Sequence, residues 1–193
     1  MSEYREKPYI RPPNGKLGVL IPGLGAVGTT FIAGTMAVRR GLADPVGSLT
    51  QLGRLPLRDG DESIRDAVPL ADVDDLVFGG WDIFDQDVYA SAKSARVLED
   101  WHLDPLREEL EAIRPMKGVF DRSYVRNLDG DHVKHYATKM QAAQMLMDDI
   151  SRFIEAHGCT RAVAVWCGST EAHVELDEVH LSLENFERGL REN

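Results

Sequence analysis

The sequence is poor in cysteine. Its 193 residues include two cysteines, Cys159 and Cys167, and neither forms a Cys-x-x-Cys pair or accompanies two histidines at metal-ligand spacing. This pattern argues against a disulfide framework and against a structural zinc site. We therefore expect no metal ion, and a location in the reducing cytoplasm.

Lysine is also scarce, and acidic residues outnumber basic ones. The chain holds six lysines, its formal net charge is -10, and its isoelectric point lies near 5.0. A protein that binds the phosphate backbone of nucleic acid normally carries a stripe of Lys and Arg that displaces counterions. The charge balance therefore argues against a nucleic-acid partner.

One long run lacks charge, but it also lacks the hydrophobicity of a membrane span. Residues 17–38 contain no charged side chain, and a run of that length is sufficient to cross a bilayer as a helix. Five of its positions are glycine, Pro22 interrupts it early, and three threonines reduce its hydrophobicity further. We predict no membrane partner. The overall composition, with 43% hydrophobic and 28% charged residues, is typical of a globular domain.

Short apolar runs alternate with helical patterns along the chain. The expected strands cover residues 16–21, 75–81, 118–120 and 161–166, and the expected helices cover residues 26–40, 86–100, 105–114 and 139–157. The last helix carries one apolar stripe, formed by Ala143, Leu146, Met147, Ile150, Phe153 and Ile154. This alternation implies a parallel sheet flanked by helices, so we predict an α/β, Rossmann-like domain over residues 15–193. The proline-containing residues 1–14 are expected to form an extended N-terminal arm.

The strongest local motif is a Gly-x-Gly-x-x-Gly pattern between the first strand and the first helix. It comprises Gly23, Gly25 and Gly28, with Ala26 and Val27 inside its second half. The first glycine permits a tight turn, the second lets the backbone approach a pyrophosphate, and the third lets helix and strand pack closely. Free N–H groups and the helix dipole favour an anion there. We predict a dinucleotide site, with a glycine-rich turn that binds no ligand as the alternative.

The acidic residue that usually accompanies this motif is missing from its usual place. It is expected about 20 residues after the glycines, where segment 45–51 contains no carboxylate. This absence weakens the prediction of an ordinary dehydrogenase. Asp82 directly follows the expected strand 75–81 and offers a carboxylate at the sheet edge where ligands of such folds bind. An N-cap for the next helix explains Asp82 equally well.

A second group of small and polar residues follows the last expected strand. Cys167, Gly168, Ser169 and Thr170 bring small side chains, hydroxyl groups and N–H groups to the same sheet edge. We expect this group to line the nicotinamide or ribose side of a cofactor. Cys167 has no evident His or Asn partner, so a buried cysteine is favoured over a catalytic thiol.

Tyr89 and Lys93 have the Tyr-x-x-x-Lys spacing of short-chain dehydrogenases, in which the lysine lowers the tyrosine pKa. In that family the pair lies much farther beyond the glycine motif, and an upstream catalytic serine is expected. We therefore interpret Tyr89 and Lys93 as one turn of an amphipathic surface helix.

Three longer segments resemble the myo-inositol-3-phosphate synthase family. They are Gly47-Ser-Leu-Thr-Gln51, Val77-Phe-Gly-Gly-Trp-Asp-Ile83 and Val165-Trp-Cys-Gly-Ser-Thr-Glu171, and segment 15–34 is similar to the same family's glycine loop. The Phe-Gly-Gly-Trp-Asp run is far more specific than the glycine motif. The resemblance covers most of the chain from Gly15 onward and concerns the N-terminal, NAD-binding half of that family.

The resemblance implies NAD as the cofactor and the conversion of glucose 6-phosphate to 1D-myo-inositol 3-phosphate, a step of inositol and phospholipid biosynthesis. In that reaction NAD oxidises the sugar, enolisation and an internal aldol step close the ring, and the hydride then returns to the product. By the same resemblance, the diphosphate contacts are Gly25, Ala26, Val27 and Gly28, the adenosine-ribose contact is Asp82, the ribose and nicotinamide contacts are Gly168, Ser169 and Thr170, and a further cofactor stretch is Gly118 and Val119.

The chain departs from this family in two ways. The eukaryotic members carry an extra residue and paired asparagines in the glycine loop, so the diphosphate contacts are expected to differ in detail. The lysine-rich, aspartate-bearing catalytic half and the oligomerising sheet are expected beyond Asn193. We therefore predict no catalytic residues in this chain and no activity from it alone, and a homo-oligomer, a tetramer by resemblance, for the complete enzyme.

Two other functions remain open at this point. One is a small NAD(P)-dependent dehydrogenase, which would act on simple alcohols or ketones. The other is a non-catalytic module that binds NAD or a partner, and whose partner affinity would change when the nucleotide binds.

Overall fold

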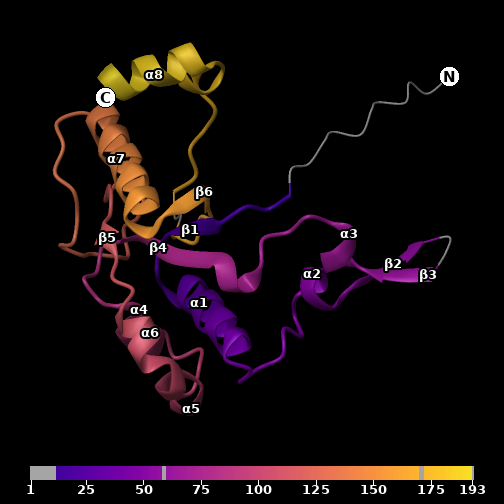
Figure 1. The fold of residues 1–193 in the computed structure, drawn as a ribbon. Helices are drawn as coiled ribbons and strands as arrows, with labels where there is room; N and C mark the ends of the chain where they lie inside the picture. The colour runs from indigo at the N-terminus through magenta and orange to yellow at the C-terminus, as the bar shows by residue number, and fades with distance from the viewer. Residues whose placement is uncertain (1–11, 58–59, 170–171, 193) are drawn as a thin grey trace, which may run out of the picture.

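A parallel four-stranded sheet forms the centre of the molecule. The computed structural model describes residues 12–57, 60–169 and 172–192. The strands are β1 (Lys16–Pro22), β4 (Leu76–Asp82), β5 (Met116–Lys117) and β6 (Cys159–Ala164), and they lie in the order β5-β4-β1-β6 (Figure 1). Every pairing in this sheet is parallel. The predicted α/β class is thus confirmed.

Helices cover both faces of the sheet. The face shared by α1 (Ala26–Arg39) and α4 (Val88–Ala95) includes α5 (Asp100–Leu103), the 3-10 turn η2 (Asp104–Leu106) and α6 (Arg107–Glu111), whereas α7 (Lys139–His157) lies on the opposite face (Figure 1). Side chains of β1 alternate between the two faces. Val19 and Ile21 enter the core beneath α1, and Leu20 joins Phe153 in the core beneath α7.

The connection from α1 to β4 contains a small excursion that the sequence analysis did not predict. It consists of α2 (Leu49–Leu52), β2 (Arg54–Leu57), β3 (Gly60–Ser63), α3 (Ile64–Ala67) and the 3-10 turn η1 (Val73–Asp75). Strands β2 and β3 pair in antiparallel fashion and extend away from the main sheet (Figure 1). Elements of three or four residues are too short to produce a recognisable hydrophobic period.

Two predicted helices are shorter than expected. The helix predicted over residues 86–100 ends at Ala95, because Arg96 adopts a left-handed conformation with φ of 53°. The helix predicted over residues 105–114 is divided into η2 and α6 and ends at Glu111. Asp104 was predicted to be the N-cap of that helix, and this prediction is wrong. Asp104 is the first residue of η2, and its carboxylate accepts a hydrogen bond from Tyr89.

The strand predicted over residues 118–120 is wrong. Strand β5 covers only Met116–Lys117, and Gly118 forms an isolated bridge to Val133 instead. The last strand also begins and ends two residues earlier than predicted, at Cys159–Ala164. In both places the strand begins where its pairing with β4 or β1 begins, and a single apolar run cannot reveal that pairing.

The helix predicted over residues 139–157 is confirmed to the residue. Thr138 caps its start by accepting a hydrogen bond from the Gln141 N–H group, and Gly158 ends it in a left-handed conformation. The predicted apolar stripe needs one correction, because Met147 is 49% exposed. Conversely, Asp149 is 4% exposed and faces the sheet, although the sequence analysis did not place it there.

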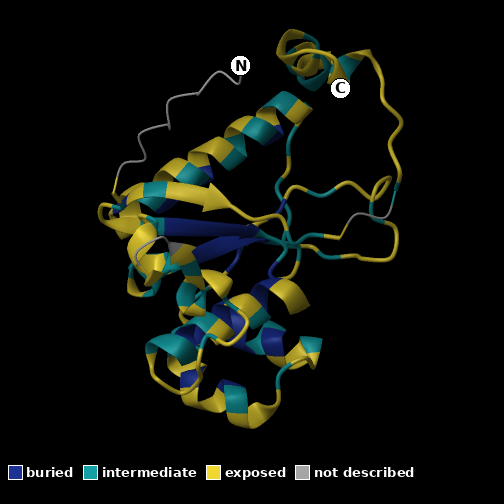
Figure 2. Ribbon diagram, turned by 90° about the vertical axis from the view of Figure 1, so that its right-hand side faces the viewer, coloured by how far each residue is buried: buried dark blue, intermediate teal, exposed yellow. Residues whose placement is uncertain are grey.

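The sheet is unequally covered. Strands β1 and β4 are buried, whereas β6 is largely exposed (Figure 2). Val163 and Val165 are 44% and 41% exposed, and Trp166 is 67% exposed. After β6 the chain forms the 3-10 turn η3 (Glu178–His180) and α8 (Leu183–Glu192), whose Leu183 and Phe186 are also exposed. The sheet edge at β6 and, separately, α8 therefore present apolar surface.

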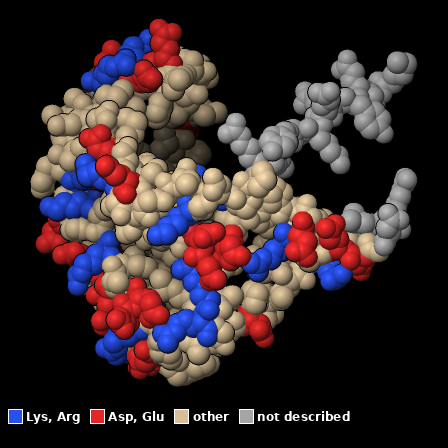
Figure 3. Space-filling view, viewed as in Figure 1, with Lys and Arg blue, Asp and Glu red and all other residues tan. Residues whose placement is uncertain are grey.

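Charged side chains are mixed over the surface. On the face seen in Figure 3, Lys and Arg lie among Asp and Glu and do not gather into a separate basic stripe. Within the described ranges, no helix is both long enough and apolar enough to cross a membrane.

Candidate functional site

The order in which the chain adds strands to the sheet reverses at β1. From β1 the chain proceeds to β4 on one side, and it returns to β6 on the other side. Ligands of open α/β sheets bind outside the carboxyl ends of the strands at such a switch point. The glycine loop after β1 and the segment after β6 meet at this position, so the candidate site lies here.

Gly23 is the tightest position of the glycine loop. Its φ is +89°, and its N–H group donates to the Trp81 carbonyl oxygen at 2.9 Å. A Cβ atom at this position would lie 2.6 Å from the Cα and N atoms of Gly168. The loop is therefore held between the end of β4 and the segment that follows β6, and only glycine fits there.

The N-terminus of α1 faces open space. Gly25 is its N-cap residue, no side chain caps the helix there, and the first turn contains no acidic residue. A Cβ atom on Gly25 would meet no heavy atom within 4 Å, and Ala26 and Val27 are exposed. The first amides of a helix have no acceptor within the helix, and the dipole is positive at this end. These groups fit the diphosphate of a dinucleotide.

Gly28 allows α1 to approach β1 closely. It is buried, and a Cβ atom there would lie 3.0 Å from the Gly23 carbonyl oxygen and 3.2 Å from Ile21 Cγ2. The buried Thr29 hydroxyl donates to the Gly25 carbonyl oxygen at 2.9 Å. The three glycines thus occupy the positions expected from the motif: a tight turn, an open approach and a close helix contact.

Asp82 lies at the carboxyl end of β4, beside the glycine loop. Its Oδ2 atom accepts a hydrogen bond from the Leu24 N–H group at 2.7 Å, and Oδ1 accepts one from the Phe84 N–H group at 3.1 Å. The alternative role as N-cap of the next helix is wrong, because Asp87 caps α4 by accepting from the Ala90 N–H group. Asp82 therefore belongs to the candidate site and supports the loop.

The position of Asp82 explains the missing acidic residue. In the usual arrangement the carboxylate ends the strand that neighbours the first strand, about 20 residues after the glycines. Here the neighbouring strand is β4, and the excursion from α2 to η1 separates it from α1 in sequence. Asp82 thus takes the equivalent place in the sheet at a much greater distance along the chain.

Gly118 and Val119 also reach this edge. The Gly118 N–H group donates to the carbonyl oxygens of Asp82 and His132, at 3.2 and 3.1 Å. Gly118 is buried, and Val119 is 38% exposed. The turn that holds both residues therefore depends on the end of β4.

The segment after β6 runs along the glycine loop. The Cys167 N–H group donates to the Pro22 carbonyl oxygen at 2.9 Å, and the Cys167 side chain packs against the core beneath α1. Gly168 lies against Gly23, Ser169 is exposed, and Thr170 lies outside the described residues. Cys167 is partly buried, which agrees with the prediction of a packed cysteine.

Two neighbours of the loop were missed by the sequence analysis. The Ser91 hydroxyl of α4 donates to the Leu24 carbonyl oxygen at 2.6 Å, and the Trp166 indole donates to the Gly168 carbonyl oxygen at 3.0 Å. Trp166 is 67% exposed beside the candidate site. A serine on a helix has no distinguishing sequence signal, whereas the tryptophan adjoining the Cys-Gly-Ser-Thr segment was a usable one.

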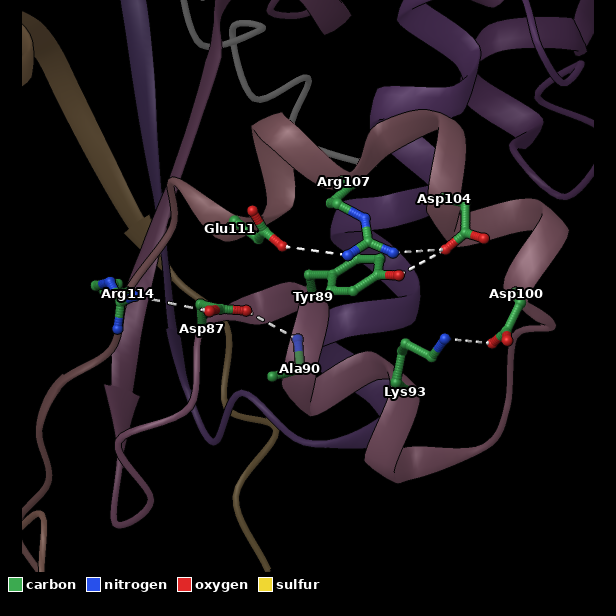
Figure 4. Close-up of polar contacts among 9 residues, drawn as sticks. All are labelled: Asp87, Tyr89, Ala90, Lys93, Asp100, Asp104, Arg107, Glu111 and Arg114. Carbon is green, nitrogen blue, oxygen red and sulfur yellow. Dashed lines mark hydrogen bonds and ion pairs between the residues drawn. The ribbon is translucent and has the colours of Figure 1, made fainter.

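Tyr89 and Lys93 form a structural cluster and are not an acid–base pair. They lie one turn apart on α4, as predicted, but Tyr89 is buried and not on the surface. The Tyr89 hydroxyl donates to Asp104 at 2.5 Å, the Arg107 guanidinium stacks over its ring, and Lys93 binds Asp100 (Figure 4). The hydrogen bond to Asp104, together with burial, raises the pKa of Tyr89. A catalytic tyrosine would need the opposite shift.

We expect Tyr89→Phe to cause a small decrease in the midpoint of thermal unfolding, because it removes the hydrogen bond to Asp104. The affinity for NAD, measured by calorimetric titration, should not change. A loss of NAD binding or of dehydrogenase activity in this variant would contradict the structural role.

A buried polar group lies on the other face of the sheet. Asp149 of α7 accepts a hydrogen bond from the Trp81 indole at 2.8 Å and pairs with Lys134 at 2.6 Å and with Arg152. Burial alone would raise the pKa of Asp149, but the bonds from Lys134 and Trp81 and the charge of Arg152 lower it overall. Among the described residues, no group of three or more His, Cys, Asp or Glu side chains is placed to hold a metal ion.

Known proteins similar to this chain share its fold and sequence pattern. An NAD-binding family model described as myo-inositol-1-phosphate synthase matches residues 17–193. Inositol-3-phosphate synthase 1 of Bacteroides thetaiotaomicron is 44% identical over 189 residues, which cover 97% of this chain and 44% of that protein. Isozyme 1 of Arabidopsis thaliana is 32% identical, over 89% of this chain and 37% of that protein.

A solved structure supports the fold. The crystal structure of inositol-3-phosphate synthase from Caenorhabditis elegans superimposes with a TM-score of 0.74 at 20% identity, covering 95% of this chain and 40% of that one. The chain therefore spans less than half the length of these relatives. Because the family model matches residues 17–193 and the bacterial relative is 44% identical, the chain belongs to the myo-inositol-1-phosphate synthase family and carries that family's NAD-binding region.

Proposed function

We propose that NAD binds across the switch point between β1 and β6. The diphosphate contacts the amides of Gly25, Ala26, Val27 and Gly28, and Asp82 binds the adenosine ribose. Gly118 and Val119 contribute from the turn after β5, and Cys167, Gly168, Ser169 and Thr170 border the ribose and nicotinamide side. The observation that supports this assignment most strongly is the uncapped α1 N-terminus, with open space in front of Gly25.

We further propose that the complete protein converts glucose 6-phosphate to 1D-myo-inositol 3-phosphate. The names of the relatives, inositol-3-phosphate synthases, support this assignment. NAD, when bound, accepts a hydride from the sugar and later returns it. The residues of this chain hold the cofactor, and the sugar and the catalytic groups belong to the remaining half. The exposed β6 suggests that further chain completes this domain.

The same proposal places the complete enzyme in the cytoplasm as a homo-oligomer. The two unpaired cysteines agree with a reducing compartment. For this chain alone we propose NAD binding without catalysis. It should form no inositol phosphate from glucose 6-phosphate and should not oxidise simple alcohols, which separates it from a small dehydrogenase.

We expect Asp82→Ala to weaken NAD binding by about 10- to 100-fold, since a hydrogen bond to a charged group contributes roughly 1.5–3 kcal/mol. Calorimetric titration of the 193-residue chain with NAD measures this change. Asp82→Asn retains an oxygen for the Leu24 N–H group, and it therefore separates loop support from the effect of the charge.

Asp74→Ala provides the control. Asp74 is an exposed carboxylate at the opposite end of β4, and its loss should leave NAD affinity unchanged. Equal affinity of the Asp82→Ala variant and the parent chain would remove Asp82 from the site.

A further inference from the structure

The buried carboxylate of Asp149 connects two segments that end at the candidate site. It lies near the middle of α7, and the sheet separates it from α1. Its Oδ2 atom accepts from the Trp81 indole at 2.8 Å and lies 2.6 Å from the Lys134 ammonium nitrogen. The side chains of Asp149 and Lys134 are 5% and 8% exposed. This ion pair is therefore almost entirely shielded from water.

The first segment leads through Trp81 to the glycine loop. While the Trp81 side chain is held by Asp149, its carbonyl oxygen accepts the hydrogen bond from the Gly23 N–H group at 2.9 Å. The next residue is Asp82, whose carboxylate accepts from the Leu24 N–H group at 2.7 Å. Two consecutive residues of β4 thus hold two consecutive amides of the glycine loop, and the indole of the first is fixed by Asp149.

The second segment leads through Lys134 to Gly118. The Lys134 N–H group donates to the Gly118 carbonyl oxygen at 2.8 Å, and the Gly118 N–H group donates to the Asp82 carbonyl oxygen at 3.2 Å. The side chain of Lys134 ends on Asp149. Asp149 therefore holds the far end of the turn that brings Gly118 to the sheet edge.

A buried ion pair is an inefficient way to stabilise a core. Desolvation of two charges costs about as much as their attraction returns, and apolar side chains of similar size often stabilise as well or better. In several proteins such a pair instead selects one arrangement of the groups that it bonds. At this site Asp149 bonds Trp81, Lys134 and the exposed Arg152, and the first two of these lead to the proposed cofactor contacts.

We propose that Asp149, with Lys134, is a positioning residue for cofactor binding that sets the geometry of Gly23 and Gly118 from the opposite face of the sheet. This inference rests on the proposed NAD site. It assigns to α7 a role beyond packing, because the helix fixes the carboxyl end of β4 in the register that the glycine loop needs.

The test compares Asp149→Asn with Asp148→Asn. Asparagine at position 149 retains an acceptor for the Trp81 indole but loses the charge that pairs with Lys134 and Arg152, whereas Asp148 is an exposed neighbour on the same helix. We expect Asp149→Asn to weaken NAD binding about tenfold, the lower end of the effect known for outer hydrogen-bonding partners of metal ligands. Asp148→Asn should bind like the parent. Calorimetry is done at a temperature at which circular dichroism shows each variant to be fully folded.

Leu106→Ala separates positioning from stability. Leu106 is 1% exposed and lies beneath α1, away from Asp149, so its truncation destabilises the chain without touching the ion pair. The folded fraction of this variant should retain the parent affinity. If Asp149→Asn also retains parent affinity while folded, the positioning role is overturned.

Amide hydrogen exchange tests the same inference without a ligand. In Asp149→Asn we expect the amides of Gly23, Leu24 and Gly118 to exchange about tenfold faster than in the parent, and faster than the change in global stability accounts for. A uniform change across all amides would overturn the inference. If the parent chain binds no NAD, the proposed function fails, and this exchange pattern still decides whether Asp149 positions the loop.

Discussion

We expect Gly25→Ala to lower NAD affinity about a hundredfold while changing the free energy of unfolding by less than about 1 kcal/mol. A methyl group there meets no heavy atom of the protein within 4 Å, and the φ of −86° lies outside the left-handed region that favours glycine, so we expect the fold to tolerate it. The same methyl group would occupy the space in front of the α1 amides. Two lost hydrogen bonds to a charged diphosphate account for the expected decrease. Calorimetric titration and urea unfolding measure the two quantities.

Gly23→Ala provides the contrast two residues earlier. Its Cβ atom would lie 2.6 Å from the backbone of Gly168, at a φ of +89° that disfavours alanine. We expect this variant to lose stability as well as affinity. NAD binding by Gly25→Ala that equals the parent would place the diphosphate elsewhere.

Gly80→Ala should reduce the free energy of unfolding by about 3 kcal/mol, the upper part of the range for overpacked cores. Its Cβ atom would lie 2.1 Å from the carbonyl oxygen of Ile21, in the strand paired with it. A flexible side chain could move aside, but the backbone of a central buried strand cannot do so without disturbing its neighbours. Urea unfolding followed by circular dichroism measures this loss.

Gly34→Ala is the matched control for that substitution. Gly34 is exposed on α1, and a Cβ atom there would meet no heavy atom within 4 Å. Alanine has the higher helix propensity, so we expect this variant to gain up to about 1 kcal/mol. If Gly80→Ala is as stable as the parent chain, the close packing of β4 on β1 is wrong.

The Phe-Gly-Gly-Trp-Asp run illustrates what resemblance and structure each contribute. As a motif it indicated the family, but it offered no physical reason for its glycines. In the fold, a Cβ atom on Gly79 would lie 2.4 Å from Phe153 of α7, and one on Gly80 would strike β1. Trp81 and Asp82 then hold the glycine loop. Each of the last four positions of the run therefore makes a contact with a segment distant in sequence.

Elements with strong local signals were predictable. Helix α7 begins at a Thr cap and ends at a glycine, and both boundaries agree with the prediction because capping depends on neighbouring residues. The strand, glycine turn and helix from Lys16 to Arg39 were predictable for the same reason. Weaker elements failed, as at Arg96, where a left-handed turn without glycine ends α4.

Local chemistry in the chain was thus enough for the α/β class, the glycine loop before α1 and the choice of cofactor family, since each depends on residues within one or two turns of each other. The contacts between residues of different strands, in contrast, were not predictable from local sequence. The pairing of β1 with β4 and β6 places Asp82 beside Leu24, Gly168 against Gly23, and Asp149 beneath Trp81. Such pairings bring together residues about 60 to 145 positions apart, and they arise only when the whole core packs, because no short-range pattern encodes them.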